Sequence, residues 1–198
     1  MKTKENIAMN KITKEGSSFE ITHYPWEDSG VHPKTIITIG YDDAGFNVHY
    51  VSYETELRAV VTEHNGDVYQ DSCMEIYMAF ADGDNHYMNI EVNPNGATYV
   101  SLSTCREESV KIDPKEIDTL GAKTQIFEDR WEIDYKIPKE FLEKYFPTYK
   151  HGKGAIMHGN FYKCGDETNH PHWGCFADIE WEYPDFHRPE FFADFELV

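Results

Sequence analysis

The sequence predicts an all-β fold, an antiparallel β-sandwich of the jelly-roll or immunoglobulin-like two-sheet type, with one short helix near residues 138–146. Segments in which apolar and polar residues alternate recur along the chain, which is typical of strands with one buried face. Gly, Pro, Asn and Asp residues separate many of these segments. The chain has 198 residues, which is enough for one such domain with a sizeable core.

The elements follow from the same patterns, taken in chain order. Residues 1–18 are polar and are expected to be loosely ordered, while residues 19–198 are expected to form a single domain. In the helix, Pro138 suits the first turn and Pro147 ends it. Strands are expected at residues 35–39, 46–54, 57–63, 73–80, 86–92, 97–102, 130–138, 155–163 and 191–198.

The strands at 73–80 and 86–92 read as a hairpin around the turn "ADGDN". If the turn is centred near Gly83, Tyr77 faces Asn89 and Glu75 faces Glu91. Two glutamates directly across a strand pair repel each other. One interpretation is a solvated outer face, where the repulsion costs little. The other is a bound Arg, a cation or sugar hydroxyls, because carboxylates and amides pair well with vicinal hydroxyls.

Polar and aromatic residues also gather late in the chain. In "HGNFYKCG" (158–165), alternation places Asn160 and Tyr162 on one face with His158. Such a face is either a ligand groove or an ordinary outward surface. The closing segment adds Trp173, Phe186 and His187, and aromatic rings stack on the C–H face of a pyranose. Core packing is the alternative, and it is preferred for Trp181 and for the closing rings Phe191, Phe192 and Phe195.

Charge and hydropathy limit the partners. The net charge is −18, which argues against nucleic acid and anionic membranes as partners, because both attract Lys and Arg. No run of about 18 apolar residues is present, so no membrane insertion is expected. The first residues lack the apolar stretch of a secretory signal. As written, the chain is expected to be cytoplasmic, or extracellular if a leader has been removed.

Metal sites and catalysis are less well defined by the sequence. Cys164, His170, His172 and Cys175 have zinc-type side chains at a spacing that matches no zinc motif. Calcium is an open alternative, with the loop carboxylates Asp42, Asp43, Asp67 and Asp71 as candidate ligands. The chain contains no nucleophile-elbow, zinc-protease or phosphate-loop motif. No catalytic residue is assigned, and no cofactor is certain.

Two segments together resemble the family 9 carbohydrate-binding modules and their family 9-like relatives. The first is "VYQDSCMEIYMAFADGDNHYMNIEVNPNGATY" (68–99), and the second runs from "GNFYKCGD" to "HRPEFFADFEL". Between them, "DRWEIDYKIP" is similar to a further family strand. The resemblance covers roughly residues 46–198. It implies a β-sandwich without catalysis, in which two aromatic rings clamp a terminal sugar.

The resemblance also implies roles for particular residues. Tyr69 falls at the first clamp position and Phe186 at the second, where Trp is usual. Glu75 falls on the sugar-binding Glu, and Asn89 stands where the family has an Arg. Tyr162 occupies a polar, Gln-type position. The full set of candidate ligand-binding residues is Tyr69, Glu75, Tyr77, Asn89, Glu91, Asn160, Tyr162, Trp173, Phe186 and His187.

The sequence therefore predicts non-catalytic binding of a sugar, an oligosaccharide or polysaccharide end of a plant-type polymer such as xylan or cellulose. Three alternatives stay open. One is a sugar-processing hydrolase such as an endoxylanase or a module of one. Another is a haem-binding domain of the related DOMON type, for which His49, Met78 and His158 are the candidate ligands. The last is an interaction module without a small ligand.

Overall fold

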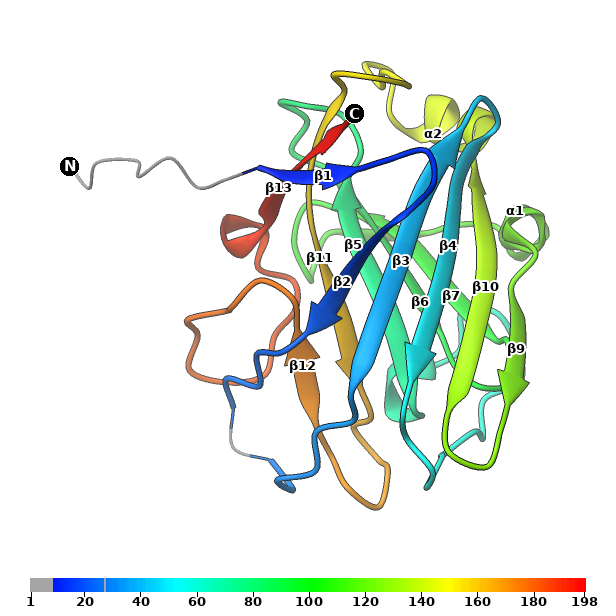
Figure 1. Ribbon diagram of the computed structural model, residues 1–198, viewed down its shortest axis with the longest axis vertical. Coiled ribbons are helices and arrows are strands. Elements are labelled where there is room, and N and C mark those ends of the chain that lie inside the picture. The colour runs from blue at the N-terminus through cyan, green and yellow to red at the C-terminus, as the bar shows by residue number, and fades with distance from the viewer. Residues whose placement is uncertain (1–8, 27) are drawn as a thin grey trace.

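The computed structural model describes residues 9–26 and 28–198, and its strands form two sheets that pack face to face (Figure 1). In order across the larger sheet, the strands are β1 (Asn10–Ile12), β13 (Ala193–Leu197), β11 (Ile156–Cys164), β5 (Cys73–Ala79), β6 (Tyr87–Val92), β7 (Thr98–Ser103) and β8 (Ser109–Lys111), with β12 (Trp173–Cys175) also paired to β11. The smaller sheet has the order β2 (Ser17–Ile21), β3 (Thr35–Asp42), β4 (Gly45–Ser52), β10 (Trp131–Pro138) and β9 (Lys123–Ile126).

Helical segments are few and short. They are α1 (Pro114–Ile117), α2 (Lys139–Tyr145) and the 3-10 turns η1 (Val68–Gln70), η2 (Asp118–Leu120) and η3 (Pro189–Phe191). Two sheets with so little helix confirm the predicted all-β sandwich, and α2 confirms the predicted helix. No helix among the described residues is both long and apolar enough to cross a membrane.

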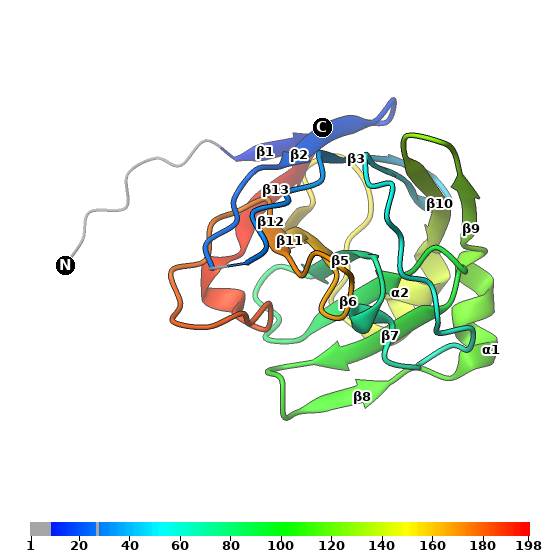
Figure 2. The same ribbon diagram turned by 90° about the horizontal axis from the view of Figure 1, so that it is seen from below.

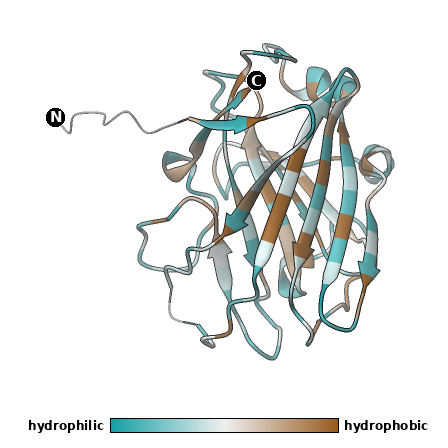
Figure 3. Ribbon diagram, viewed as in Figure 1, coloured by the Kyte–Doolittle hydropathy of each residue, from teal (hydrophilic) through white to brown (hydrophobic). Residues whose placement is uncertain are grey.

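The core between the sheets is built from alternating strand residues. Ile133, Tyr135 and Ile137 of β10 point inward, as do Met74, Ile76 and Met78 of β5. Figure 3 shows the resulting alternation of apolar and polar bands along β3, β4 and β10. Burying one face of each strand against the other sheet removes apolar area from water and fixes the register, because a slip of one residue would expose the core face.

The larger sheet differs from an ordinary sandwich sheet because its second face is also covered. Tyr77, Tyr162 and Phe186 belong to a separate buried cluster on that face. The loops before β5 and after β11, together with the β7–β8 hairpin, lie around it, as the view in Figure 2 shows. All residues of β5 and β6 are therefore buried, on both faces. This covered outer face holds the candidate site.

Three expectations differ from the structure. Residues 57–63 form no strand, because Asp71 accepts hydrogen bonds from the backbone N–H groups of Val60 and Val61 and the segment needs no sheet partner. Within the segment 1–18 expected to be loose, β1 pairs with β13 and the first two residues of β2 pair with β3, while residues 1–8 lie outside the described part. The third difference is Trp181, for which core packing was preferred but which is 38% exposed. The short strands β8, β9 and β12 are additional elements that the sequence did not predict.

Candidate functional site

A pocket of about 370 Å³ opens on the outer face of the larger sheet. Strands β5 and β6 supply its floor, because their outward residues alternate with the core residues. Loops from distant parts of the chain form its walls. Eight of the predicted ligand-binding residues line it, namely Tyr69, Glu75, Tyr77, Asn89, Glu91, Trp173, Phe186 and His187. The structure therefore brings most of the predicted residues into one pocket.

Two predicted residues do not line the pocket. Asn160 is fully buried, and its side chain is bonded to the backbone of Ala177 through both a donated and an accepted hydrogen bond of 2.8 Å. Tyr162 is also fully buried and lies behind Phe186, with the two rings stacked at 4.0 Å between centroids. Alternation along β11 places both residues on the outer face of the sheet, but the loops after β11 cover that face. Asn160 and Tyr162 were expected to line the groove, but they lie beneath it and support its wall.

The predicted hairpin register is confirmed. Glu75 lies opposite Glu91, and Tyr77 lies opposite Asn89. Both glutamates are at least 95% buried, with exposed fractions of 1% and 5%. The Tyr77 hydroxyl and the Asn89 amide donate to Glu91 Oε1 at 3.1 and 2.8 Å. The two carboxyl groups are therefore not on a solvated surface, and one of them is held in place by neighbouring donors.

Burial changes the protonation of these carboxyl groups. Removal from water, and then the nearby Glu91, raise the pKa of Glu75 well above its ordinary value. Burial also raises the pKa of Glu91 to about 7, against the hydrogen bonds from Asn89 and Tyr77, which lower it. The pair consequently holds at least one proton near neutral pH, and a protonated carboxyl group can donate as well as accept a hydrogen bond.

Asn89 is used within the protein. Its amide donates to Glu91, while its carbonyl oxygen accepts from the hydroxyl groups of Ser101 and Ser103. With an exposed fraction of 1%, it borders the pocket but has its polar atoms engaged. Asn89 therefore positions Glu91, and its direct contact with a sugar stays a prediction.

A cation that sequence reasoning missed lines the pocket wall. Arg106, in the loop between β7 and β8, donates from Nη2 and Nε to Asp185 at 2.6 and 3.2 Å. Asp185 also accepts from the backbone N–H of His187 at 3.1 Å, so the ion pair fixes the segment that carries Phe186. Burial, together with Arg106, lowers the pKa of His187 to about 4, which keeps its ring neutral.

The other wall combines rings and a carboxylate. The Trp173 indole N–H donates to Asp166 at 2.8 Å, and burial raises the pKa of Asp166. Tyr69 is 42% exposed, so its ring remains available at the mouth. Lys111 lies over the Tyr99 ring, 5.1 Å from its centroid. The lining residues outside the predicted ligand-binding set are Asp67, Tyr99, Arg106, Ser109, Lys111, Cys164, Asp166, Pro184 and Asp185, of which Asp67 and Cys164 were candidates only as metal ligands.

The alternative metal and haem sets are not assembled. Among the described residues, Cys164, His170, His172 and Cys175 do not form a metal-type cluster, and His172 contacts Lys163 and the His170 carbonyl. The calcium candidates form no such cluster in the described part either, and Asp71 is bound by Arg58, Asn93 and backbone N–H groups.

The three haem candidates lie in different surroundings. Met78 lies in the core between the sheets, whereas His49 and His158 lie on the surface and pair with carboxylates. The structure therefore offers no common pocket for these three side chains within the described residues.

A two-sheet β-sandwich with a pocket of rings, carboxyl groups and a guanidinium on one face has the architecture of a carbohydrate-binding module. Residues 4–197 match the family model described as Carbohydrate-binding family 9, and the chain belongs to this family. No curated protein matches the chain.

Solved structures share the fold. A Bacteroides uniformis protein, described as a candidate for carbohydrate binding, is 24% identical with a TM-score of 0.83, covering 96% of this chain and 97% of its own. A family 9 module of Caldicellulosiruptor kristjanssonii in complex with glucose is 15% identical with a TM-score of 0.66, over 93% and 85% of the two chains. A structure from the same organism in complex with cellotriose is 13% identical with a TM-score of 0.66, over 96% and 93%.

Proposed function

We propose that the pocket binds the end of an oligosaccharide or polysaccharide of the plant type, such as cellulose or xylan, without chemically changing it. The observation that carries the proposal is the meeting of Tyr69, Phe186 and the Glu75–Glu91 pair in one pocket. Aromatic rings pack on the apolar faces of a sugar ring, while carboxyl groups in the plane of the ring take its hydroxyl groups. The family, and the glucose and cellotriose bound by the Caldicellulosiruptor modules, support this chemistry.

The walls favour a single sugar ring over a long internal stretch of polymer. The volume of about 370 Å³ is at the lower end of the range for small-ligand pockets. The Arg106–Asp185 ion pair holds the Phe186 segment beside it. The last ring of a polymer can enter such a pocket. If an internal ring were bound, the polymer would have to pass out of the pocket on both sides of that ring.

Calorimetry tests this proposal. The protein is titrated with glucose, xylose, cellobiose and xylobiose and with the reduced alditols of the disaccharides, in the presence and absence of calcium. Heat that appears with a disaccharide and vanishes with its alditol would support capture of a reducing end. Equal heats would instead show that the reducing end is not recognised. No heat with any sugar would contradict the proposed carbohydrate binding.

A matched pair of variants locates the binding. Tyr69→Ala removes a ring from the mouth, and Tyr53→Ala removes a similarly exposed ring that does not line the pocket. The first should lower the affinity roughly tenfold, which corresponds to one stacked ring face, and the second should leave it unchanged. Equal effects would place the sugar elsewhere.

The second candidate function is glycoside hydrolysis. It is favoured by one observation, two carboxyl groups with raised pKa values in the same pocket. Release of product from chromogenic glucosides and xylosides, abolished in both Glu75→Gln and Glu91→Gln, would establish it. Binding of these glycosides without release of product would support the non-catalytic function.

A further inference from the structure

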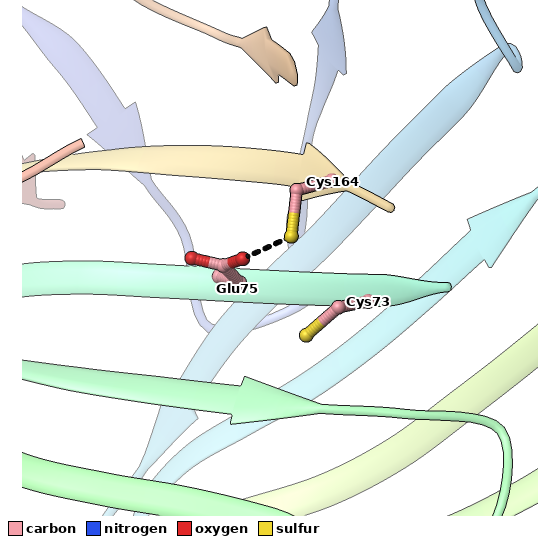
Figure 4. Close-up of side chains that lie close together, drawn as sticks. All are labelled: Cys73, Glu75 and Cys164. Carbon is pink, nitrogen blue, oxygen red and sulfur yellow. Dashed lines mark hydrogen bonds between the residues drawn. The ribbon is translucent and has the colours of Figure 1, made fainter. Parts of the chain in front are cut away.

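Two cysteines and a glutamate meet beside the pocket (Figure 4). Cys73 on β5 and Cys164 on β11 are direct cross-strand partners, and Glu75 lies two residues beyond Cys73 on the same face of β5. The two Sγ atoms and a carboxylate oxygen of Glu75 all lie within 4.8 Å of one another. Each side chain is at least 99% buried. No other group of this kind occurs in residues 9–26 and 28–198.

Glu75 is incompletely satisfied in this position. Its Oε1 accepts from the Cys164 thiol at 2.7 Å, but Oε2 is buried and has no hydrogen-bond partner among the described residues. A buried polar atom without a partner costs free energy, so such an atom in a folded protein calls for a binding partner. The thiol of Cys164 also contacts the Tyr69 carbonyl at 3.4 Å.

The charges around the cluster point to the kind of partner. Glu91 lies opposite Glu75 on the neighbouring strand, and Asp166 lines the same pocket. The pocket cations are engaged elsewhere, since Arg106 pairs with Asp185 and Lys111 donates to the Asn65 carbonyl. Within the described part of the chain, no cationic side chain forms an ion pair with Glu75. A dense group of acids without a cation is a site that a positive ion can neutralise.

We propose that Cys73, Glu75 and Cys164 bind a thiophilic divalent cation of the Zn²⁺ type. Two sulfurs and one carboxylate oxygen are a donor set that suits Zn²⁺ and disfavours Ca²⁺ and Mg²⁺, which take oxygen ligands. The three side chains leave a fourth tetrahedral position on the pocket side, because Glu75 and Cys164 line the pocket. The site shares Glu75 with the proposed sugar pocket, but metal binding is measured without any sugar.

The geometry needs only a small adjustment. In a tetrahedral zinc site, with bonds of about 2.3 Å to sulfur and about 2.0–2.2 Å to oxygen, ligand atoms stand roughly 3.5–3.8 Å apart. The present separation of 2.7 Å between Cys164 Sγ and Glu75 Oε1 must therefore widen by about 1 Å. Rotation about the Cα–Cβ bond of Cys164 and about the side-chain bonds of Glu75 can supply that movement without displacing the strands.

Protons compete with the metal. Burial raises the pKa of Cys73 to about 12 and raises that of Cys164 well above its ordinary value, so both are thiols in the metal-free protein. Binding replaces those thiol protons with the cation, which draws both sulfurs into the thiolate form. Glu91 and Asp166 add acidic groups around Glu75, and the Tyr77 hydroxyl, which stays protonated, lies beside them. The affinity is therefore expected to rise with pH, and each ion bound should release about three protons, two from the thiols and one from Glu75.

Cobalt titration tests the site, because Co²⁺ takes the place of Zn²⁺ and reports its ligands. The protein is first reduced with a non-thiol reductant, and four free thiols are verified, one for each cysteine in the chain. Addition of Co²⁺ should give a thiolate-to-cobalt charge-transfer band with the intensity of two thiolates, together with tetrahedral visible bands. Zn²⁺ should then bleach both. Fully reduced wild-type protein without the band in excess Co²⁺ overturns the proposal.

Variants assign the ligands. Cys73→Ala and Cys164→Ala should each halve the band per bound ion and lower the affinity by at least roughly 10- to 100-fold, the loss typical for a residue that only supports a ligand. Glu75→Gln should keep both thiolates, and hence the band, while weakening the affinity. Cys175→Ala, which removes another buried cysteine, and Cys105→Ala should change neither. A band that survives the loss of both Cys73 and Cys164, or that is lost with Cys105, overturns the assignment. If a variant does not fold, the band intensity of the wild-type protein still gives the number of thiolate ligands.

Discussion

Tyr162 and Phe186 stack face to face, with ring centroids 4.0 Å apart and planes 10° from parallel, and the Tyr162 hydroxyl donates to the Phe186 carbonyl at 3.2 Å. A strand residue thus holds a loop residue by both its ring and its hydroxyl. Because Tyr162 is fully buried, the Phe186 ring has a rigid support on one side.

Truncation of this support should loosen the pocket. Tyr162→Leu is expected to lower the free energy of unfolding by about 2–4 kcal/mol, since it removes a packed ring and a hydrogen bond. It should also weaken sugar binding, although Tyr162 does not line the pocket. Tyr162→Phe keeps the stack and should retain most of the affinity. Urea unfolding and calorimetry on both variants check this, and equal affinities in Tyr162→Leu and the wild type would contradict it.

The buried Glu91 should make stability depend on pH in the direction opposite to that of most acids. Its pKa is about 7 in the folded protein and near 4.5 without the fold, so the folded state holds more protons between these values. Stability from this group is complete below about pH 4.5 and is lost as the pH rises to about 7. The slope is at most about 1.4 kcal/mol per pH unit.

Glu91→Gln mimics the protonated side chain and should remove this slope. The stability of the variant relative to the wild type should therefore increase as the pH rises from about 4.5 to 7. The comparison must be between proteins, because the lowered pKa values of His172 and His187 make stability rise with pH in the wild type and the variant alike. Glu20→Gln, at an exposed carboxyl group, is the control. Melting temperatures over this pH range that run parallel for wild type and Glu91→Gln would refute the role of Glu91.

Lys163 is fully buried, and its replacement should destabilise the fold strongly. Its Nζ lies 3.0 Å from Glu54 and donates to the Cys164 carbonyl at 2.7 Å. Lys163→Met leaves the Glu54 carboxylate buried without its cation, which should cost about 3–5 kcal/mol. The double variant with Glu54→Gln should recover part of this loss. Denaturant unfolding of the two single variants and the double variant measures the coupling, and additive losses would show that the pair does not interact.

Arg106 should matter to the pocket through both its charge and its shape. Arg106→Ala removes the two donors to Asp185 and frees the segment that carries Phe186 and His187. We expect the sugar affinity to fall by roughly 10- to 100-fold, the range for a charge-assisted hydrogen bond. Arg106→Lys restores the charge but not the paired geometry and should recover only part. Arg130→Ala, outside the pocket, is the control, and an affinity unchanged in Arg106→Ala would rule out this role.

The fold and the central hairpin could be predicted because their signals are local. Alternation along β5 and β6 and the turn between them sufficed to place Glu75 opposite Glu91. Alternation could not tell that the outer face of β11 is covered, and so Asn160 and Tyr162 were expected in the groove rather than beneath it. Residues 57–63 have a strand-like pattern, but Asp71 takes up backbone donors there that a neighbouring strand would have bonded.

The remaining site residues depend on contacts between distant segments. Arg106 lies in a hairpin loop with no periodic signal, and only the folded chain brings it to Asp185. The sequence offered Cys164 as a metal ligand together with its neighbours in the chain. The strand pairing of β5 with β11 instead sets it beside Cys73, which no local spacing could reveal.

The parallel pairing of β1 with β13 has a mechanical consequence. The described chain enters at β1 and ends just after β13, and these strands lie side by side at the edge of the larger sheet (Figure 1). Because the strands run in the same direction, pulling on the start of β1 and the end of β13 slides one along the other. Their hydrogen bonds then bear the force together instead of breaking one at a time, so this edge of the sheet resists a force that pulls the two ends of the chain apart.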